Sequence, residues 1–362
     1  MNIAICAATP FQTLNAINLS MHSLDKATKK ILFYRNYSET TNRILENILR
    51  YDIFDEVYEY DLVKKDNKFY YIINDLIQAT CPRLFIRWIT KKHIDVINFD
   101  IDLITVTSGT EFEVALTRIF PEANTIAYDD GLGSYVGDIV HDHKLKWIWR
   151  FLGRKTDHIK PDLLYVNNVT FCKSTLSKNK KQLSPIALMD KNEKEMYMNI
   201  FGNVEDDIYS KKKLIYLSQP TNELGVNLEN SEKEINKCLL KFKNQVVYRR
   251  HPRDISEKKI NFSEDQSSSL WELICEEQLS NDSILLSICS SSQIMPKLLY
   301  NKEPWIIFTY KLYGLENSDV YKNRFKPVIE MIKQIYNDKK KVLEPTSIDD
   351  LEIIIVNILK GN

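Results

Sequence analysis

Short apolar runs alternate with amphipathic segments along much of the chain. Residues 2–8 (NIAICAA) form an apolar run that predicts a buried strand, and residues 10–24 have the periodic spacing of a helix that begins with proline. Further strands are predicted at residues 30–34, 54–60, 102–108 and 124–129, and further helices at residues 40–51, 70–92 and 110–121. Strands that alternate with helices indicate a parallel sheet with crossover connections.

The alternation weakens after Tyr135 and begins again at residue 213. Residues 174–213 are rich in Lys, Asn and Ser, so we place the passage between two domains there and assign residues 1–185 to the first and 186–362 to the second. In the second domain, strands are predicted at residues 213–220, 245–252, 283–292 and 304–310, and helices at 232–242, 270–277, from 293, and at 348–359. We predict an α/β protein of two domains that face each other across a cleft.

Composition narrows the classes of partner. The 362 residues are 44% hydrophobic and 27% charged, which is typical of a soluble globular protein, and Lys plus Arg equals Asp plus Glu at 49 each. A net charge of zero gives no global attraction to nucleic acid, so we expect no nucleic acid partner. The N-terminus does not resemble a signal peptide, no apolar run approaches the ~20 residues that span a bilayer, and the six cysteines form no CxxC pair. We expect a cytoplasmic protein and leave open a peripheral contact with the membrane.

Two adjacent acids follow the predicted strand at 124–129. Ligand sites of parallel α/β sheets lie outside the carboxyl ends of the strands, and Asp129-Asp130-Gly131 stands at such an end. Neighbouring carboxylates raise each other's proton affinity, and one that faces a cleft can accept a proton from a substrate hydroxyl. The alternative is an ordinary Asp-Gly turn in which one acid accepts hydrogen bonds from the backbone.

A histidine among arginines follows another predicted strand end. Residues 249–253 read RRHPR, and Pro252 favours an extended conformation at His251. The imidazole can donate a hydrogen bond or a proton to a departing phosphate. The alternative is a basic surface turn.

Three consecutive serines end the apolar run at 283–289. Ser290, Ser291 and Ser292 precede a predicted helix, where hydroxyl and free N–H groups suit a phosphate. The alternative is helix N-capping, which needs one serine only.

Two other segments, and the absence of three motifs, bear on metal binding, on membrane contact and on the NTPase, dinucleotide oxidoreductase and serine hydrolase classes. The histidines of HDH at 141–143 do not complete a ligand set, so we interpret that segment as a loop and expect no metal site. Residues 144–155 (KLKWIWRFLGRK) are interpreted as a core helix with a charged face or as an interfacial helix near a membrane-borne acceptor. The phosphate-binding loop, the dinucleotide fingerprint and the GxSxG motif are absent from the sequence.

The ordered set of acid-acid-Gly, His-Pro and serine motifs resembles bacterial sialyltransferases. The opening AATPFQ, the DDGLGSY context, SQP at 218–220 and HPR at 251–253 look most like glycosyltransferase family 52, which contains lipooligosaccharide and capsule sialyltransferases. The resemblance covers nearly the whole chain. It implies the GT-B fold, which is two Rossmann-like domains with the nucleotide sugar held mainly by the second, and it agrees with the predicted alternation.

The resemblance also implies roles for particular residues. Asp130 is expected to be the base that deprotonates the acceptor hydroxyl, with Asp129 and Gly131 supporting it, and His251 to assist the departure of CMP. The expected donor-binding residues are Gln219, Pro252, Glu272, Ser290, Ser291 and Ser292. Glu272 is assigned to the ribose of the donor, although its context in SLWEL departs from the Pro-rich context that is usual in related enzymes.

The activity implied is an inverting transfer of sialic acid from CMP-sialic acid to a terminal galactose in α-2,3 linkage, without a metal or other cofactor. The expected partners are the nucleotide sugar and a glycan acceptor, and a homodimer is left open. Two alternatives also stay open: the same fold with a UDP-sugar donor, and a glycan- or nucleotide-binding protein without catalysis.

Overall fold

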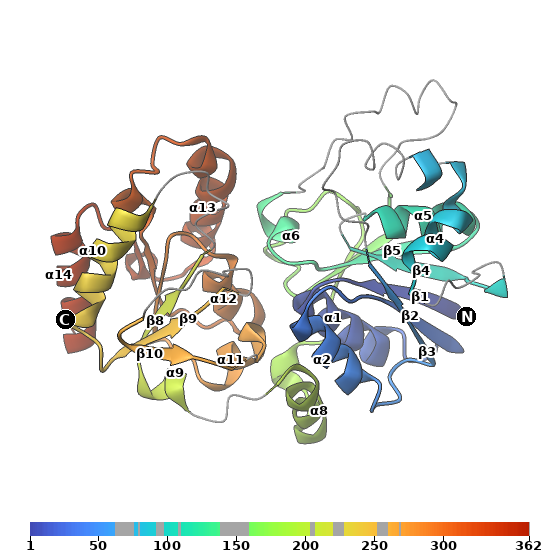
Figure 1. The fold of residues 1–362 in the computed structure, drawn as a ribbon, viewed down its shortest axis with the longest axis horizontal. Helices are drawn as coiled ribbons and strands as arrows, with labels where there is room; N and C mark the ends of the chain where they lie inside the picture. The colour runs from blue at the N-terminus through green and yellow to red at the C-terminus, as the bar shows by residue number, and fades with distance from the viewer. Residues whose placement is uncertain are drawn as a thin grey trace. The chain divides into compact units, whose positions relative to one another are not determined.

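The computed structural model describes residues 1–61, 76–78, 80–91, 98–107, 110–137, 159–202, 207–219, 228–251, 260–267 and 269–361. Pro252 and the segments 141–143 and 144–155 lie outside these residues. The chain forms two compact units, Met1–Phe201 and Gly202–Asn362 (Figure 1). The boundary after Phe201 lies within the passage predicted at residues 174–213 and beyond the domain limit predicted at residue 185.

The first unit contains a seven-stranded parallel sheet in the order β3-β2-β1-β4-β5-β6-β7. Its strands are β1 (Asn2–Ala7), β2 (Lys29–Arg35), β3 (Glu56–Tyr60), β4 (Leu103–Val106), β5 (Asn124–Tyr128), β6 (Leu163–Val166) and β7 (Lys180–Gln182). Its α-helices are α1 (Pro10–Asn18), α2 (Glu39–Ile48), α4 (Pro82–Ile89), α5 (Glu111–Ile119), α6 (Gly133–Val136) and α8 (Lys191–Phe201). The strand order reverses between β1 and β4, as in Rossmann folds.

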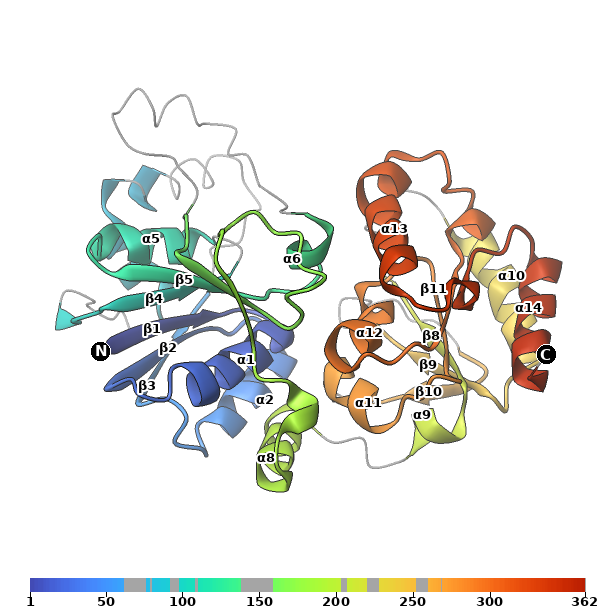
Figure 2. The ribbon, with the colours of Figure 1, turned by 180° about the vertical axis from the view of Figure 1, so that it is seen from behind.

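Helices cover both faces of this sheet (Figures 1 and 2). Helix α1 begins sharply because Thr9 and Gln12 form a capping box and Pro10 occupies the first turn. On the opposite face, α4 and α5 bury Phe85, Phe112 and their neighbours against the strands. Both faces are covered, so the central strand β1 is apolar and buried nearly throughout.

The second unit repeats this topology with a six-stranded parallel sheet in the order β10-β9-β8-β11-β12-β13. Its strands are β8 (Leu214–Leu217), β9 (Val246–Arg249), β10 (Ser263–Asp265), β11 (Ile284–Ser287), β12 (Trp305–Phe308) and β13 (Val342–Leu343). Its α-helices are α9 (Ile208–Lys211), α10 (Glu229–Leu240), α11 (Trp271–Glu277), α12 (Met295–Tyr300), α13 (Lys326–Ile335) and α14 (Ile348–Lys360). The order again reverses beside the first strand of the unit, between β8 and β11.

The main differences from the sequence-based expectations lie after Tyr135 and around Pro82. Strands β6 and β7 extend the first sheet beyond the predicted strands. Edge strand β7 is polar and half exposed, so it leaves no apolar pattern. Strand β6 (LLYV) is apolar and buried, so its short run carried a signal that the prediction did not use. Helix α8 belongs to the first unit, where Arg43 Nη2 donates to Phe201 O at 3.3 Å and Asn47 Nδ2 to Ile200 O at 3.2 Å. The helix predicted at 70–92 is interrupted at Cys81, since α4 begins at Pro82 and ends at Ile89.

Candidate active site

Asp129 holds the turn that follows β5. Its side chain is fully buried. Oδ1 accepts a hydrogen bond from Gly131 N at 3.0 Å, and Oδ2 accepts from the hydroxyl of Tyr135, from Asn167 N at 3.2 Å and from Asn167 Nδ2 at 3.1 Å. Burial raises the pKa of Asp129, and these hydrogen bonds oppose that rise by favouring the carboxylate. Asp129 thus makes the backbone contacts expected of an Asp-Gly turn.

Further residues that were not among the predicted site residues hold the turn in place. Asn15 Nδ2, on α1, donates to the backbone oxygen of Asp129 at 2.9 Å, and Asn167 Nδ2 donates to Asn15 Oδ1 at 3.2 Å. The Tyr135 hydroxyl, which donates to Asp129, accepts from Asn168 N at 3.2 Å. Helix α1 also buries Gln12, Thr13 and Asn18, so no sequence signal distinguishes Asn15 from its polar neighbours.

Asp130 is placed differently from its neighbour. It is only partly buried, and it follows β5 at the carboxyl edge of the first sheet. Gly131 has a φ of 120°, a conformation that L-residues rarely adopt. A Cβ atom at Gly133 would lie 3.5 Å from Asp130 Oδ1, so the Asp130 carboxylate extends over the start of α6. The two adjacent acids are therefore separated into a buried carboxylate that accepts four hydrogen bonds and a more accessible one.

In the second unit, the loops after β8 and β11 are joined at the point where the strand order reverses. The Gln219 side chain donates through Nε2 to the backbone oxygen of Cys289 and accepts from Cys289 N at 3.4 Å. The Ser218 hydroxyl accepts from the backbone N–H of His251 at 2.8 Å, which positions the residue after β9. Gln219 and His251 thus lie at the carboxyl edge of the second sheet, where ligands of such sheets bind.

The serine run forms a capped 3₁₀ turn between β11 and α12. Ser290 is buried, its hydroxyl accepts from Ser292 N at 3.2 Å, and its N–H donates to Gln293 Oε1 at 3.0 Å, so this serine is the N-cap. Ser291 is exposed and Ser292 is half-buried. One serine therefore caps the turn itself, and the other two are less buried.

Trp271 joins the serine turn to helix α11. Its Nε1 donates to the backbone oxygen of Ser292 at 2.8 Å, and the guanidinium carbon of Arg249 lies 5.6 Å from the centre of its ring. Arg249 in turn donates to Asp265, to the backbone of Ser269 and to Tyr209. The end of β9, the start of α11 and the serine turn are thus held together.

Glu272 lies beside this cluster at the start of α11. It is buried, and burial raises its pKa to about 7, while its own backbone N–H and the positive charge of Arg249 favour the carboxylate. A carboxyl group with a pKa near neutrality at a sheet edge is a candidate for ligand binding. The structure thus brings Gln219, His251, Glu272 and the serine turn to one edge of the second unit.

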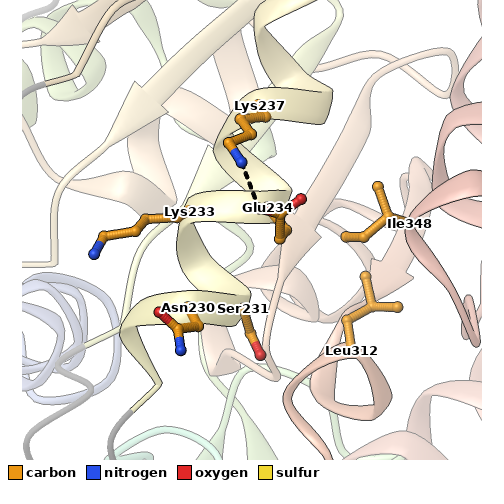
Figure 3. A pocket seen from close by; sticks show the side chains of 7 residues that line it. All are labelled: Asn230, Ser231, Lys233, Glu234, Lys237, Leu312 and Ile348. Carbon is orange, nitrogen blue, oxygen red and sulfur yellow. Dashed lines mark hydrogen bonds and ion pairs between the residues drawn. The ribbon is translucent and has the colours of Figure 1, made fainter.

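A surface hollow in the second unit lies apart from the predicted site residues. A hollow of about 480 Å³ along α10 is lined by Asn230, Ser231, Lys233, Glu234, Lys237, Leu312 and Ile348. In Figure 3 the Lys237 ammonium group points toward Glu234, and the two form an ion pair at 2.6 Å. None of the predicted site residues lines this hollow.

Among the described residues, no group of His, Cys, Asp and Glu side chains is arranged to hold a metal ion. In the same part of the chain, no helix has the length and apolar character needed to cross a membrane.

Comparison with solved structures supports the fold. No model of a known protein family and no curated protein sequence matches the chain. The structure is similar to the kitacinnamycin glycotransferase, with a TM-score of 0.55 at 10% identity, covering 99% of this chain and 90% of that one. It is also similar to the spinosyn rhamnosyltransferase SpnG complexed with thymidine diphosphate, with a TM-score of 0.54 at 8% identity, covering 100% of this chain and 92% of that one.

The similarity extends to a protein of a different reaction class. A putative UDP-N-acetylglucosamine 2-epimerase from Listeria monocytogenes has a TM-score of 0.51 at 8% identity, with 99% of this chain and 88% of that one covered. The fold is therefore GT-B, the architecture of many nucleotide-sugar glycosyltransferases, as predicted. At these identities the likeness establishes the fold, and the reaction has to be argued from the residues.

Proposed function

We propose that this protein is an inverting sialyltransferase that transfers sialic acid from CMP-sialic acid to a terminal galactose, in α-2,3 linkage. The observation that carries the proposal is the separation of the two adjacent acids. The buried Asp129 carboxylate accepts four hydrogen bonds that hold the turn. The partly exposed Asp130 is therefore the carboxylate suited to accept a proton from a substrate. The motif resemblance to glycosyltransferase family 52 supports the donor.

The proposed reaction is a single displacement. A hydroxyl oxygen of galactose attacks the anomeric carbon of sialic acid, and the bond from that carbon to the phosphate oxygen breaks with its electron pair. The hydroxyl proton passes to Asp130, and the β-linked donor becomes an α-sialoside. His251 and the hydroxyls of Ser291 and Ser292 are proposed to stabilise the charge on the departing CMP phosphate.

The donor half would use the remaining predicted residues. We assign Glu272 to the ribose hydroxyls, and Gln219 to holding together the two loops that border the nucleotide. A phosphate whose charge is neutralised by a His side chain, hydroxyl groups and backbone N–H groups does not need a divalent cation, so metal-independent transfer is part of the proposal.

The decisive experiment measures CMP release from CMP-sialic acid with lactose as acceptor, followed by linkage analysis of the product. We expect transfer by the wild type, and less than about 1% of that rate for Asp130→Ala, because general-base catalysis contributes roughly 10²–10⁴-fold. An Asp130→Ala variant that is folded and fully active would refute the assignment of the base.

A UDP-sugar donor is the second candidate, because the fold is shared with an enzyme named for such a donor and does not itself select the nucleotide. A UDP-glucosyltransferase from Polygonum tinctorium has a TM-score of 0.55 at 10% identity, with 99% of this chain covered. Thermal-shift measurements with CMP, UDP and GDP separate the candidates, since the nucleotide that binds the folded state raises the melting temperature. Stabilisation by UDP and not by CMP would replace the proposed donor. Nucleotide binding without release from any donor would indicate a protein that binds without catalysis.

A further inference from the structure

An aromatic side chain lies directly against the turn that carries Asp130. Phe11 stands in the first turn of α1, immediately beyond the carboxyl end of β1, and its side chain is partly exposed. A Cβ atom at Gly131 would lie 3.8 Å from Phe11 Cδ1 and 3.9 Å from Phe11 Cε1, which is ordinary van der Waals contact. One edge of the Phe11 ring therefore borders the space that a side chain at Gly131 would occupy.

Two residues on one face of helix α1 lie against the acid turn, and one of them is hydrogen-bonded to it. Phe11 and Asn15 are four residues apart and so lie one above the other on α1. Phe11 borders the space beside Gly131, and Asn15 Nδ2 donates to the backbone oxygen of Asp129 at 2.9 Å. Phe11 and Asn15 belong to the same helix, and Asn15 is hydrogen-bonded to the turn, so the helix holds the Phe11 ring at a fixed place beside the turn.

The backbone that carries Phe11 is also fixed at the helix start. Gln12 Oε1 accepts from Ala8 N at 2.9 Å and from Thr9 N at 3.2 Å, and Thr9 Oγ1 accepts from Gln12 N at 3.2 Å. A ring on a backbone held in this way loses little conformational freedom when a ligand covers it.

The chemistry of a galactose acceptor matches this arrangement. One face of the galactose ring presents C–H groups, and its edge presents hydroxyls. A partly exposed aromatic ring can cover the C–H face, while a carboxylate beside the ring accepts the hydroxyl proton. Phe11 follows β1 and Asp130 follows β5, with β4 between these strands in the sheet. The Phe11 ring nevertheless lies beside Gly131, the residue that follows Asp130, so an aromatic surface and a carboxylate belong to the same edge of the first sheet.

We propose that Phe11 is the platform on which the acceptor sugar stacks, and that it selects acceptors with an apolar sugar face. The inference rests on the proposed function, because the acceptor is the galactoside of that reaction. It adds an acceptor-binding residue to a set that otherwise contains only the base and the donor-binding groups.

The test compares substitutions that change the ring but keep an apolar side chain. Phe11→Leu should raise the KM for lactose roughly tenfold while kcat stays within about twofold, and Phe11→Tyr should retain the wild-type KM. Hydrolysis of CMP-sialic acid without acceptor should be unchanged in both variants. Phe120→Leu is the matched control, since Phe120 is also partly buried but follows α5, which leads away from the carboxyl edge.

Two kinetic outcomes would overturn the proposed role of Phe11. An unchanged KM for lactose in Phe11→Leu would show that the ring serves only to pack the turn, and so would a parallel loss of transfer and hydrolysis.

Saturation-transfer NMR with lactose alone gives a reading that is independent of the donor. We expect the signals of the galactose C–H face to be lost in Phe11→Leu and kept in Phe120→Leu, and equal signals in all variants would refute the inference. A wild type that releases no CMP but shows these lactose signals would refute the proposed donor and leave the platform standing.

Discussion

Asn15 and Asp129 are 114 residues apart in the chain, and the Asn15 side chain donates a 2.9 Å hydrogen bond to the backbone oxygen of Asp129. The bond reaches the main chain and not the carboxylate, so it holds the turn in place whether or not Asp129 is ionised. Asn15 Oδ1 accepts from Asn167 Nδ2 at 3.2 Å, which connects the same turn to the end of β6. In the proposed reaction, Asn15 is a positioning residue for Asp130.

Replacement of Asn15 by leucine tests this role. Asn15→Leu should lower the free energy of unfolding by about 1–3 kcal/mol, because the buried Asp129 carbonyl and the Asn167 amide lose a partner. It should also lower kcat with lactose, while hydrolysis of the donor without acceptor persists. Steady-state kinetics and urea unfolding measure the two effects.

Asn18→Leu is the control on the same helix. Asn18 is buried, and its Nδ2 donates to Ser184 O at 2.8 Å, so a similar loss of stability is expected. Ser184 lies outside the acid turn, and kcat should therefore be kept. Equal losses of kcat in the two variants would mean that the Asn15 effect is one of general stability.

The two adjacent acids should respond in opposite ways to conversion to asparagine. Asp129→Asn places an amide N–H₂ group or a weaker acceptor where four donors converge, and a loss of roughly 1.5–3 kcal/mol in stability is expected. Asp130→Asn should cost less stability and remove most of the transfer activity. Calorimetry on both variants, with transfer assays at matched folded fractions, decides the matter, and a reversal of the two phenotypes would exchange the roles.

The alternation of strands and helices allowed two α/β domains with parallel sheets to be predicted, because buried parallel strands leave continuous apolar runs such as residues 2–8. The GT-B architecture itself was implied by the resemblance of the motifs to bacterial sialyltransferases. The edge strand β7 was missed since KKQ has no apolar face, and α8 was assigned to the wrong side of the boundary because its partner α2 lies far away in sequence. At the site, Asp129 and Asp130 could be selected from their neighbours in the chain. The partners that distinguish them, Asn15 and Asn167, are brought close only by the fold, and local spacing cannot reveal them.

Two glycines around Asp130 should differ in their tolerance of alanine. Gly131 has a φ of 120°, so Gly131→Ala should cost about 1–3 kcal/mol even though the nearest Phe11 atom is 3.8 Å from the new methyl group. Gly133 lies at the start of α6, and the new methyl group would meet Asp130 Oδ1 at an ordinary 3.5 Å. Gly133→Ala should therefore leave the melting temperature equal or higher. Thermal unfolding of the pair checks the order, and a less stable Gly133→Ala would contradict it.

Trp271→Phe should weaken nucleotide binding without unfolding the second unit. The substitution removes the 2.8 Å hydrogen bond from Nε1 to Ser292 O and keeps an aromatic ring near Arg249. We expect a stability loss of about 1 kcal/mol and a several-fold rise in the dissociation constant of CMP, because the serine turn is less well fixed. Isothermal titration with CMP measures this dissociation constant.

Trp305→Phe provides the control, since Trp305 begins β12 and contacts Lys341, away from the serine turn. Equal affinities for CMP in wild type and Trp271→Phe would show that the serine turn does not depend on this bond.

Glu272 should make stability fall as the pH rises toward neutrality. Burial raises its pKa from 4.5 to about 7, so between these values the folded protein holds a proton that the unfolded chain releases. Below about pH 4.5, Glu272 is protonated in both the folded and the unfolded state and does not lower the free energy of unfolding. As the pH rises from there through 7, ionisation of the buried carboxyl group lowers the free energy of unfolding by up to roughly 3 kcal/mol. Glu272→Gln resembles the protonated form and should remove this slope.

Urea unfolding at pH 5 to 8 isolates the effect as a difference between variants. Glu272→Gln should match the wild type near pH 5 and become more stable than it by pH 8. Glu303→Gln is the control of opposite sign. Although burial raises the pKa of Glu303, hydrogen bonds from Asn337, Lys297 and Asp338 lower it overall, so its carboxylate is ionised throughout this range. The wild type should therefore exceed Glu303→Gln by an amount that does not vary with pH. A difference between wild type and Glu272→Gln that is equally constant would show that Glu272 titrates below pH 5 and is ionised whenever a nucleotide could bind.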